Sequence, residues 1–436
     1  MNAPTDSARD PRLLDLGRRA RAAARQLASL STAKKDFALQ RLVEAMTKAR
    51  AEILDANDQD VAAAVAAGLD AAFCDRLRLT PARVDAIALD VLRCAALHDP
   101  IGETFDAVTL PSGLHLHKQR VPIGVLAVIY ESRPNVTIDV AALALKTGNA
   151  VILRGGSESR RSNRALVAAV HAALDETSIP LDAVQFIDEP DRRLVAELLR
   201  LREWVDLIIP RGGNALHDFC RENSFIPVIT GGIGICHLFV DASADLNAAL
   251  DVIHNAKTQR PTVCNALDTV LLHRAIAGAF LPALTARLTA DGVALRADPS
   301  ARPYFAPAGG AGEPPLPAGV APASPTDFDT EWLSLVLGVK VVDSLDEALA
   351  HIAQHSTGHS DGILTNDEQQ AQRFIAEVDS AAVYVNASTR FTDGSEFGLG
   401  AEVAVSTQRL HARGPMGLRE LTTYKWVGRG NYLTRR

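Results

Sequence analysis

The fold class of this chain is decided by the stretch VLAVIYESRPNVTIDVAALALKTGNAVILRGG, residues 125–156. Two short apolar runs enclose a helical pattern, and polar, turn-forming residues follow each run. The same alternation continues downstream: apolar runs occupy 125–130, 150–153, 184–187 and 205–209, and helical patterns begin near Thr137, Ser162 and Arg192. This order predicts parallel βαβ units in a doubly wound sheet, with room for a nucleotide outside the carboxyl ends of its strands.

The sequence on either side of this stretch extends the α/β prediction. In the first hundred residues apolar side chains recur three or four apart, as in residues 39–46, which predicts amphipathic helices. Residues 114–130 alternate and then become continuously apolar, which favours a strand or hairpin that leads into a buried strand. A second α/β block runs from about residue 240 to 385. It is interrupted at 297–327, where proline, glycine and alanine are too dense for a helix or a central strand, so we expect a surface loop, as in an ordinary tolerated insertion.

Composition excludes several classes of function. The chain has 436 residues, of which 47% are hydrophobic and 22% charged, enough for two or three domains with large cores. A formal charge of -7 gives no basic footprint for nucleic acid, and no apolar run is long enough for a membrane span. We find no signal peptide and no disulfide or zinc pattern among the five cysteines. We therefore expect a cytoplasmic protein.

Cys264 is the candidate nucleophile. It lies in AKTQRPTVCNALDTVLLH, residues 256–273, between a polar turn and a strand that looks buried. A reactive thiol needs partial exposure and an electropositive surround, and Lys257 and Arg260 are close in sequence. A second interpretation stays open, because cysteine is also a common buried apolar residue.

Two strand-to-helix turns carry paired glycines, Gly155 with Gly156 and Gly212 with Gly213. Backbone amides at such turns can bind an anionic group, although tight turns without a ligand also favour glycine. The GxGxxG fingerprint is absent.

The first glycine turn also indicates which nicotinamide cofactor is used. No carboxylate stands at Ser157, and Arg154, Arg160 and Arg161 supply positive charge nearby. This combination favours the 2'-phosphate of NADP(H) over NAD(H).

The segment YESRPNVTID, residues 130–139, ends a strand with a charged turn. Arg133 could bind a carboxylate or phosphate in fork geometry, and the Asn135 amide could donate to a developing oxyanion. Asn135 could instead cap the helix that follows, and both roles could coexist. The histidines show no metal-ligand spacing, so we expect no metal.

Six motifs occur in one collinear order between about residue 15 and 430: YESRPN, ALKTGNAVILRGG, IPRGGN, QRPTVCN, DTEWLSLVLGVKVV and FGLGAEVAVSTQRLHARGPMGLRELTTYKW. In these motifs the chain resembles the gamma-glutamyl phosphate reductases, a family within the aldehyde dehydrogenase superfamily. The resemblance implies an aldehyde-dehydrogenase-like α/β fold with two doubly wound parallel-sheet domains plus a small oligomerisation hairpin. The implied segments are N-terminal helices of the cofactor domain (1–106), the oligomerisation hairpin (107–120), the NADPH-binding domain (121–240), the catalytic domain with Cys264 (241–400), and a return to the cofactor domain with a C-terminal oligomerisation strand (401–436).

The resemblance also implies a reaction, the NADPH-dependent reduction of L-glutamate 5-phosphate to L-glutamate 5-semialdehyde and phosphate. Cys264 would form a thioester, and Asn135 would stabilise the oxyanion. Glu331 resembles the carboxylate that holds the nicotinamide ribose, although alone it would pass for a solvated loop acid.

The remaining predictions concern the substrate and the partners of the protein. Arg133 and Arg390 are candidates for the two anionic ends of the substrate, and which arginine takes which end stays open, as does a surface salt bridge for Arg390. The semialdehyde cyclises to pyrroline-5-carboxylate, which places the reaction in proline biosynthesis. We expect a homo-oligomer, dimer or tetramer, with glutamate 5-kinase as a possible partner.

Two alternatives compete with this reading. One is a semialdehyde dehydrogenase of the same superfamily that works in the oxidative direction, and the other is a non-catalytic nucleotide-binding scaffold. Oxidising relatives carry a glutamate before a paired glycine to activate the hydrolytic water, whereas here Val228, Ile229 and Thr230 precede Gly231 and Gly232. Loss of that general base favours reduction of an acyl phosphate.

Overall fold

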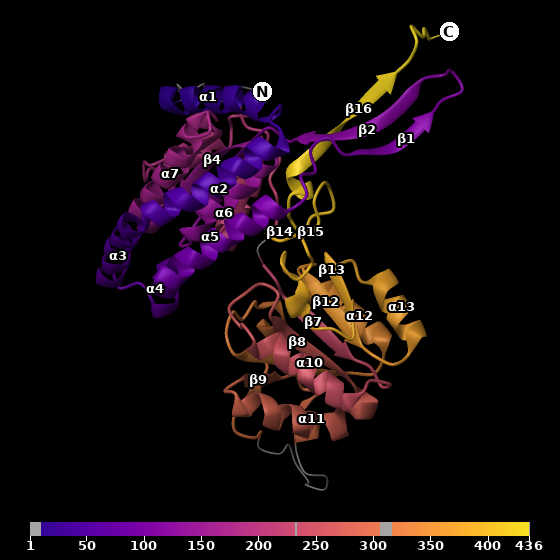
Figure 1. Ribbon diagram of the computed structural model, residues 1–436. Helices are drawn as coiled ribbons and strands as arrows, with labels where there is room; N and C mark the ends of the chain where they lie inside the picture. Colours follow the sequence, from indigo (N-terminus) through magenta and orange to yellow (C-terminus); the bar gives the residue numbers. More distant parts are fainter. Residues whose placement is uncertain (1–9, 232, 306–315, 436) are drawn as a thin grey trace, which may run out of the picture. The chain divides into compact units, whose positions relative to one another are not determined.

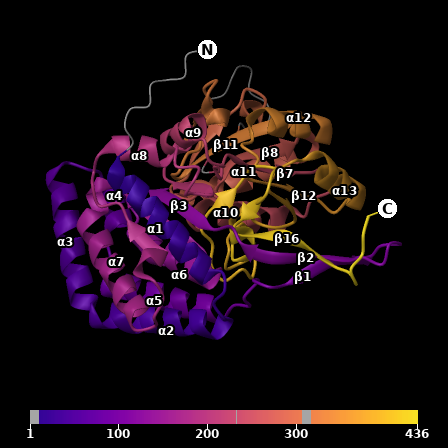
Figure 2. The same ribbon diagram turned by 90° about the horizontal axis from the view of Figure 1, so that it is seen from above.

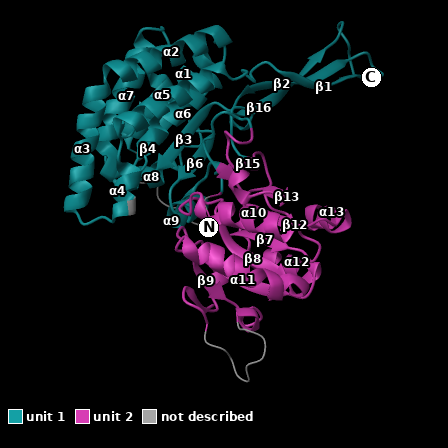
Figure 3. Ribbon diagram, turned by 60° about the horizontal axis from the view of Figure 1, so that its bottom comes forward, with its two compact units in different colours: residues 1–230, 398–404, 415–436 teal, residues 231–397, 405–414 magenta. Residues whose placement is uncertain are grey.

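The structure, a computed structural model, describes residues 10–231, 233–305 and 316–435 (Figure 1). The chain forms two compact units (Figure 3). Unit 1 comprises residues 1–230, 398–404 and 415–436, and unit 2 comprises residues 231–397 and 405–414. The segment roles that the resemblance implied remain predictions.

Unit 1 begins with a layer of helices, as the apolar spacing predicted. They are α1 (Pro11–Leu27), α2 (Thr32–Lys48), α3 (Arg50–Ala66), α4 (Ala71–Leu77) and α5 (Pro81–Ala96). Four of these helices have an N-cap residue whose side-chain oxygen accepts a hydrogen bond from a backbone N–H of the first turn. These N-cap residues are Asp10, Ser31, Asp70 and Thr80. Such caps satisfy amides that the helix itself leaves unpaired.

A four-stranded parallel sheet in the order β5-β4-β3-β6 forms the centre of unit 1. Its strands are β3 (Val125–Tyr130), β4 (Ala150–Gly155), β5 (Val184–Phe186) and β6 (Leu207–Arg211). The intervening helices are α6 (Asn135–Lys146), η1 (Ser157–Ser159), α7 (Arg160–Asp175), η2 (Leu181–Ala183), α8 (Arg192–Leu198) and α9 (Asn214–Asn223). The predicted βαβ alternation is confirmed.

The last strand of this sheet starts two residues later than the apolar run suggested. The amide of Val205 still donates to Leu201 in a turn, and Asp206 is the first residue whose amide reaches Val125. Apolar character alone therefore placed the strand too early.

Three antiparallel strands form a second sheet of unit 1, in the order β1-β2-β16. They are β1 (Thr104–Thr109), β2 (His115–Pro122) and β16 (Thr422–Arg429), and they lie side by side in Figures 1 and 2. The predicted hairpin leading into β3 is confirmed. Three short elements precede β16 in the chain: β14 (Val405–Ser406), which belongs to unit 2, β15 (Gly414–Pro415) and η6 (Arg419–Leu421).

Unit 2 contains a seven-stranded, all-parallel sheet in the order β10-β9-β11-β8-β7-β12-β13. The strands are β7 (Cys236–Val240), β8 (Leu267–His273), β9 (Ala294–Ala297), β10 (Val320–Pro322), β11 (Val336–Val342), β12 (Ser360–Leu364) and β13 (Ala382–Val385). The helices are α10 (Leu246–Thr258), α11 (Arg274–Ala290), η3 (Arg302–Phe305), η4 (Asp327–Asp329), α12 (Leu345–His355), α13 (Glu368–Glu377) and η5 (Thr389–Phe391).

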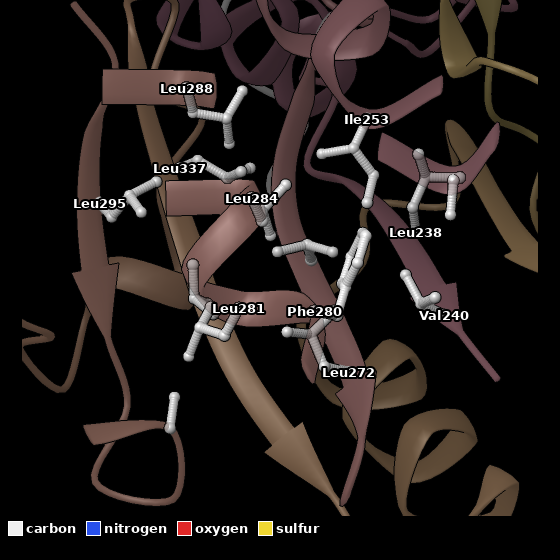
Figure 4. Packing of buried hydrophobic residues seen from close by; sticks show 14 of the residues in the cluster. Leu238, Val240, Ile253, Leu272, Phe280, Leu281, Leu284, Leu288, Leu295 and Leu337 are labelled. Atoms are coloured by element: carbon white, nitrogen blue, oxygen red, sulfur yellow. The ribbon is translucent and has the colours of Figure 1, made fainter. Parts of the chain in front are cut away.

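The largest part of the core of unit 2 lies between the sheet and helices α10 and α11 (Figure 4). Phe280 and Leu284 of α11 pack there with Ile253 of α10 and with Leu238 and Leu272 of the central strands. Each Å² of apolar surface buried in this core stabilises the fold by about 25 cal/mol. The core therefore fixes the strand ends that carry the candidate residues.

The proline-rich stretch 297–327 contains regular elements among the residues that the structure describes. It includes η3 and the short strand β10, while residues 306–315 lie outside the described part of the chain. The expectation of a surface loop is therefore wrong for η3 and β10, whereas the expectation of no central strand holds in the described residues, where β10 pairs with β9 at the sheet edge.

The described residues were searched for membrane-spanning helices and for metal sites. None of the helices combines the length and the apolar character needed to cross a membrane. No group of three or more histidine, cysteine, aspartate or glutamate side chains in those residues is arranged to hold a metal ion.

Candidate active site

Cys264 of unit 2 lies in the turn between α10 and β8, where the sequence placed it. It is half-buried, whereas Cys74, Cys94, Cys220 and Cys236 are buried. Since a nucleophile must reach its substrate, only this thiol among the five meets the exposure requirement.

The backbone of Cys264 is in direct contact with the segment before β7. A Cβ added to Gly234 would lie 1.6 Å from the Cys264 carbonyl oxygen, so only glycine fits there. The same carbonyl accepts a hydrogen bond from the Cys236 thiol at 3.3 Å. Burial raises the pKa of Cys236 well above its usual value, which keeps this second thiol protonated.

Arg390 supplies positive charge near Cys264. The pKa of Arg390 is lowered by burial and by Arg260, and the Cys264 thiol is among the groups that act on it in the opposite direction. Lys257 is fully buried, and its ammonium donates to the Leu267 carbonyl at 2.9 Å. The Lys257 side chain therefore points from α10 toward β8, and its effect on the Cys264 thiol stays a prediction.

Asn265 ties the turn of Cys264 to the segment that carries Arg390. Its side-chain amide donates to the carbonyl oxygens of Thr392 at 2.9 Å and Arg390 at 3.4 Å, and its own carbonyl accepts from Thr389 Oγ1 at 2.8 Å. Arg390 Nε donates to Gln259 Oε1 at 2.8 Å. Among the described residues Arg390 has no carboxylate within ion-pair distance, so the salt-bridge interpretation of this side chain is wrong.

Glu331 follows η4 and lies beside the same backbone segment. Its Oε1 accepts the Gly234 amide at 2.9 Å, and burial raises its pKa. The Gly234 amide thus donates to Glu331, and because Gly234 has no side chain, the Cys264 carbonyl can lie directly against its backbone. The structure brings these two predicted residues to one backbone segment of unit 2, while the role of Glu331 toward a ribose stays a prediction.

In unit 1 the candidate residues gather at the carboxyl edge of the parallel sheet. Strands β3 and β6 are neighbours whose connections leave in opposite directions, which makes the gap between their carboxyl ends a topological switch point. Glu131 follows β3, and its Oε2 accepts the amide of Gly213 at 3.1 Å. A Cβ on Gly212 would lie 2.3 Å from that oxygen, whereas one on Gly213 would meet nothing within 4 Å.

The turn after β4 holds a second carboxylate. Glu158 accepts the amide of Ser132 at 2.7 Å, and a Cβ on Gly156 would lie 2.1 Å from its Oε1. Ser132 takes the left-handed conformation, with φ of 49°. The space at Gly155 is different, because a Cβ there would lie 2.1 Å from Asn163 Nδ2 of α7. Gly155 therefore serves helix packing and Gly156 leaves room for an oxygen.

Of the arginines near Ser157, Arg160 and Arg161 are engaged by carboxylates, Asp188 at 2.8 Å and Asp60 at 3.2 Å. Arg154 instead donates to backbone carbonyls of Gly155 and Pro190, and burial lowers its pKa. Ser157 itself is exposed at the start of η1.

Asn135 is the first residue of α6 and does not cap it. The cap position is Pro134, and the Asn135 amide donates to Asp139 Oδ2 at 2.9 Å, one turn along the helix. The helix-cap interpretation is wrong, because Pro134 already starts the helical turn. Burial raises the pKa of Asp139 to about 6. Arg133 is exposed in the preceding turn.

Sequence reasoning missed the supporting residues Glu131, Glu158, Gly234 and Asn265. The sequence prediction was that the glycines before β7 form no phosphate loop, and it overlooked that a glycine beside a strand also indicates close backbone approach. The two glutamates gave no signal, since their partners are backbone amides of other turns.

Comparison with known proteins places these features in a family. The model of the aldehyde dehydrogenase family matches residues 13–301 and 309–427. The gamma-glutamyl phosphate reductase of Serratia marcescens is 56% identical over 423 residues, which cover 97% of this chain and 100% of that protein.

Solved structures agree. The crystal structure of gamma-glutamyl phosphate reductase from Thermotoga maritima superposes with a TM-score of 0.93 at 47% identity, covering 97% of this chain and 100% of that one. An acetylating aldehyde dehydrogenase from Geobacillus thermoglucosidasius, with a TM-score of 0.68 at 17% identity over 98% of each chain, shares the fold.

Proposed function

The chain belongs to the aldehyde dehydrogenase family, and from this premise we propose its function as the reduction of L-glutamate 5-phosphate to L-glutamate 5-semialdehyde with release of phosphate. The observation that carries this conclusion is the collinear identity, over nearly the full chain, with gamma-glutamyl phosphate reductases. The chain is thus an oxidoreductase with gamma-glutamyl phosphate reductase activity, acting in proline biosynthesis.

Cys264 is the proposed nucleophile. Its thiolate attacks the acyl carbon of the substrate, the bond to the phosphate oxygen breaks, and a thioester forms on the sulfur. Arg390 interacts electrostatically with this thiol, which favours the thiolate. The Asn135 amide is the proposed oxyanion donor: its nitrogen carries two N–H groups, so one can keep its bond to Asp139 while the other donates to the substrate oxygen.

The proposed cofactor is NADPH, held by the carboxyl edge of the unit 1 sheet. The amides of Ser132 and Gly213 already donate to carboxylate oxygens, which supports their use toward the oxygens of a pyrophosphate. Arg154, Gly155, Gly156, Ser157 and Gly212 complete this proposed set, and Glu331 of unit 2 would hold the nicotinamide ribose. When bound, a reduced nicotinamide supplies the hydride that converts the thioester to the aldehyde.

Arg390 and Arg133 are the proposed partners of the two anionic ends of the substrate. Arg390 Nε is held by Gln259, so the outer edge of its guanidinium is positioned to bind a carboxylate or phosphate bidentately. Arg133 lies in the exposed turn next to Asn135.

We further propose a homo-oligomer in the cytoplasm, with glutamate 5-kinase as a partner that supplies the labile acyl phosphate. The free cysteines of the described residues suit a reducing compartment.

The decisive experiment follows the reverse reaction. With glutamate 5-semialdehyde as substrate, NADP+ reduction should require inorganic phosphate, because phosphate is the group that releases the acyl chain from Cys264. Turnover that is equal in phosphate-free buffer would favour an oxidising semialdehyde dehydrogenase instead. Running both cofactors in parallel decides between NADP+ and NAD+.

A further inference from the structure

Unit 1 contains a cavity of about 350 Å³ that the proposed reaction does not use. It is lined by residues of α1, of the turn before β1, of β2 and of β16, and by Gly124 just before β3. Because Gly124 precedes the first residue of β3, the cavity lies at the amino-terminal edge of the parallel sheet. The six residues of β3 separate it from the carboxyl edge by about 20 Å, at about 3.3 Å per residue.

Four cationic side chains line this cavity, which we call the α1 cavity: Arg21, Arg25, Arg120 and Lys425. The structure shows no carboxylate among its lining residues. Apolar surface from Ala24, Ala28, Ile101, Val121 and Pro122 makes up much of the rest of the wall.

Two of these cations are fixed by partners. Arg21 forms a bidentate pair with Asp206, at 2.7 and 2.9 Å, and Asp206 also accepts the amide of Val125. A Cβ on Gly124 would lie 2.2 Å from Asp206 Oδ2, so the glycine, with φ of 132°, leaves the space that this pair needs. The wall around Arg21 is therefore built in advance of any ligand.

Arg120 is held in a similar way. Its Nε donates to Glu103 at 3.1 Å and its Nη1 to Thr422 Oγ1 at 3.1 Å. Glu103 is shared with Arg419 at 3.0 Å, so one carboxylate faces two guanidinium groups and does not neutralise both. The local charge remains positive.

The other two cations have no anionic partner. Within the described part of the chain, neither Arg25 nor Lys425 makes an ion pair or a side-chain hydrogen bond. Lys425 is directly opposite Gln119 in the antiparallel pairing of β16 with β2, and the Gln119 amide lines the same cavity. Cations gathered in a concave wall without counter-charges attract small anions.

We propose that the α1 cavity binds a small organic dianion, a dicarboxylate or a phosphomonoester, between Arg25 and Lys425. The oxyanion groups meet these two side chains and the Gln119 amide, while the carbon chain lies on the apolar wall. Its volume suits a ligand of metabolite size. Since the cavity lies at the opposite edge of the sheet from the proposed cofactor turns, such a ligand would bind alongside the substrates.

Crystals of the full-length protein soaked in selenate test the position. We expect an anomalous peak between Arg25 and Lys425, and a peak confined to the surroundings of Cys264 would overturn the proposal. Co-soaks with succinate and with glycerol 3-phosphate then separate the two sources of oxyanion, because the preferred class displaces selenate at the lower concentration.

Calorimetric titration of the same two compounds measures the affinity in solution. Arg25→Ala with Lys425→Ala should weaken binding by at least about tenfold. Arg18→Ala is the matched control, since Arg18 is on the same helix but pairs with Asp15 and lies outside the cavity lining. Equal affinity in the double variant and the control contradicts the proposal. So does a change of oligomer mass in the double variant without any change in ligand binding, which would assign the cavity to a contact between copies.

Discussion

Cys264→Ala removes the only half-exposed thiol among the five cysteines. We expect kcat for acyl-phosphate reduction to fall by at least about 10⁴-fold, because a thioester can no longer form. NADPH binding, measured by fluorescence titration, should stay unchanged, since the proposed cofactor turns belong to unit 1. Cys94→Ala is the control: this thiol is buried in α5 and should keep full activity. Substantial residual turnover of Cys264→Ala would assign the nucleophile elsewhere.

A buried ion pair in unit 2 makes its stability depend on pH. Lys257 Nζ and Asp268 Oδ1 are 3.7 Å apart, and burial lowers the pKa of Lys257 to about 8 and raises the pKa of Asp268 to about 6. From pH 3.8 to about 6 folded Asp268 retains a proton that the unfolded chain has lost, so the free energy of unfolding falls as pH rises. From about pH 8 to 10.5 the unfolded chain holds the extra proton on Lys257, so the free energy rises with pH.

Substitutions separate the two contributions. Asp268→Asn should remove the acidic slope and destabilise unit 2 by about 3 to 5 kcal/mol near pH 7, because it leaves a buried ammonium without its anion. Lys257→Met combined with Asp268→Asn should recover much of that loss and flatten both slopes. Hydrogen exchange of β8 amides in urea reports on unit 2 specifically. An unaltered acidic slope in the double variant would mean that another group causes it.

At the level of the strands and turns, Gly234 is a point of contact between the segment before β7 and the turn of Cys264. Gly234→Ala would bring a Cβ to 1.6 Å from a backbone oxygen, and neither backbone can yield without displacing the thiol. We expect at least about a 100-fold loss of kcat and a lower melting temperature.

The matched control is Gly278→Ala in the same unit. Gly278 is exposed in the second turn of α11, and the nearest atom to its added Cβ, from Tyr304, is at 3.8 Å. This variant should gain about 0.5 to 1 kcal/mol of stability, as alanine does over glycine inside a helix, and keep its activity. Calorimetry and steady-state assays compare the pair. Full activity in Gly234→Ala would show that the turn tolerates displacement.

The order of elements could be predicted from the sequence because it depends on local periodicity. Strand β3 and the hairpin before it, and the alternation of strands with α6, α7 and α8, all follow from apolar spacing. The start of β6 could not be placed, because an apolar run continues through a turn. The contacts at the candidate site join turns that are far apart in the chain, such as Asn265 with Thr392 or Ser132 with Glu158. Such pairs leave no periodic signal in the sequence. The sequence could therefore predict the chemically reactive and charged residues of the site, but not the contacts that hold them in place.

For the molecule as a whole, the three-stranded sheet β1-β2-β16 determines what assembly we expect. In the described residues β1 and β16 each pair only with β2, so both edges of the sheet are open. Lys118 lies over the rings of Tyr424 and Trp426, at 4.6 and 5.0 Å from their centroids, and still leaves Trp426 57% exposed. Open edges and exposed aromatic side chains together favour a covering partner, and a second copy of the chain is the one we propose.

Trp426→Glu tests this assembly. A carboxylate in place of the indole should oppose burial of this face, so we expect the oligomer to dissociate with a constant raised at least about tenfold. Light scattering after gel filtration, over a dilution series, measures the mass. Tyr432→Glu provides the control, because Tyr432 follows β16 and its side chain is fully exposed. If the wild type is monomeric at micromolar concentration, or if Trp426→Glu keeps the wild-type mass throughout the dilution series, the sheet has no such role, and its exposed aromatic side chains need another explanation.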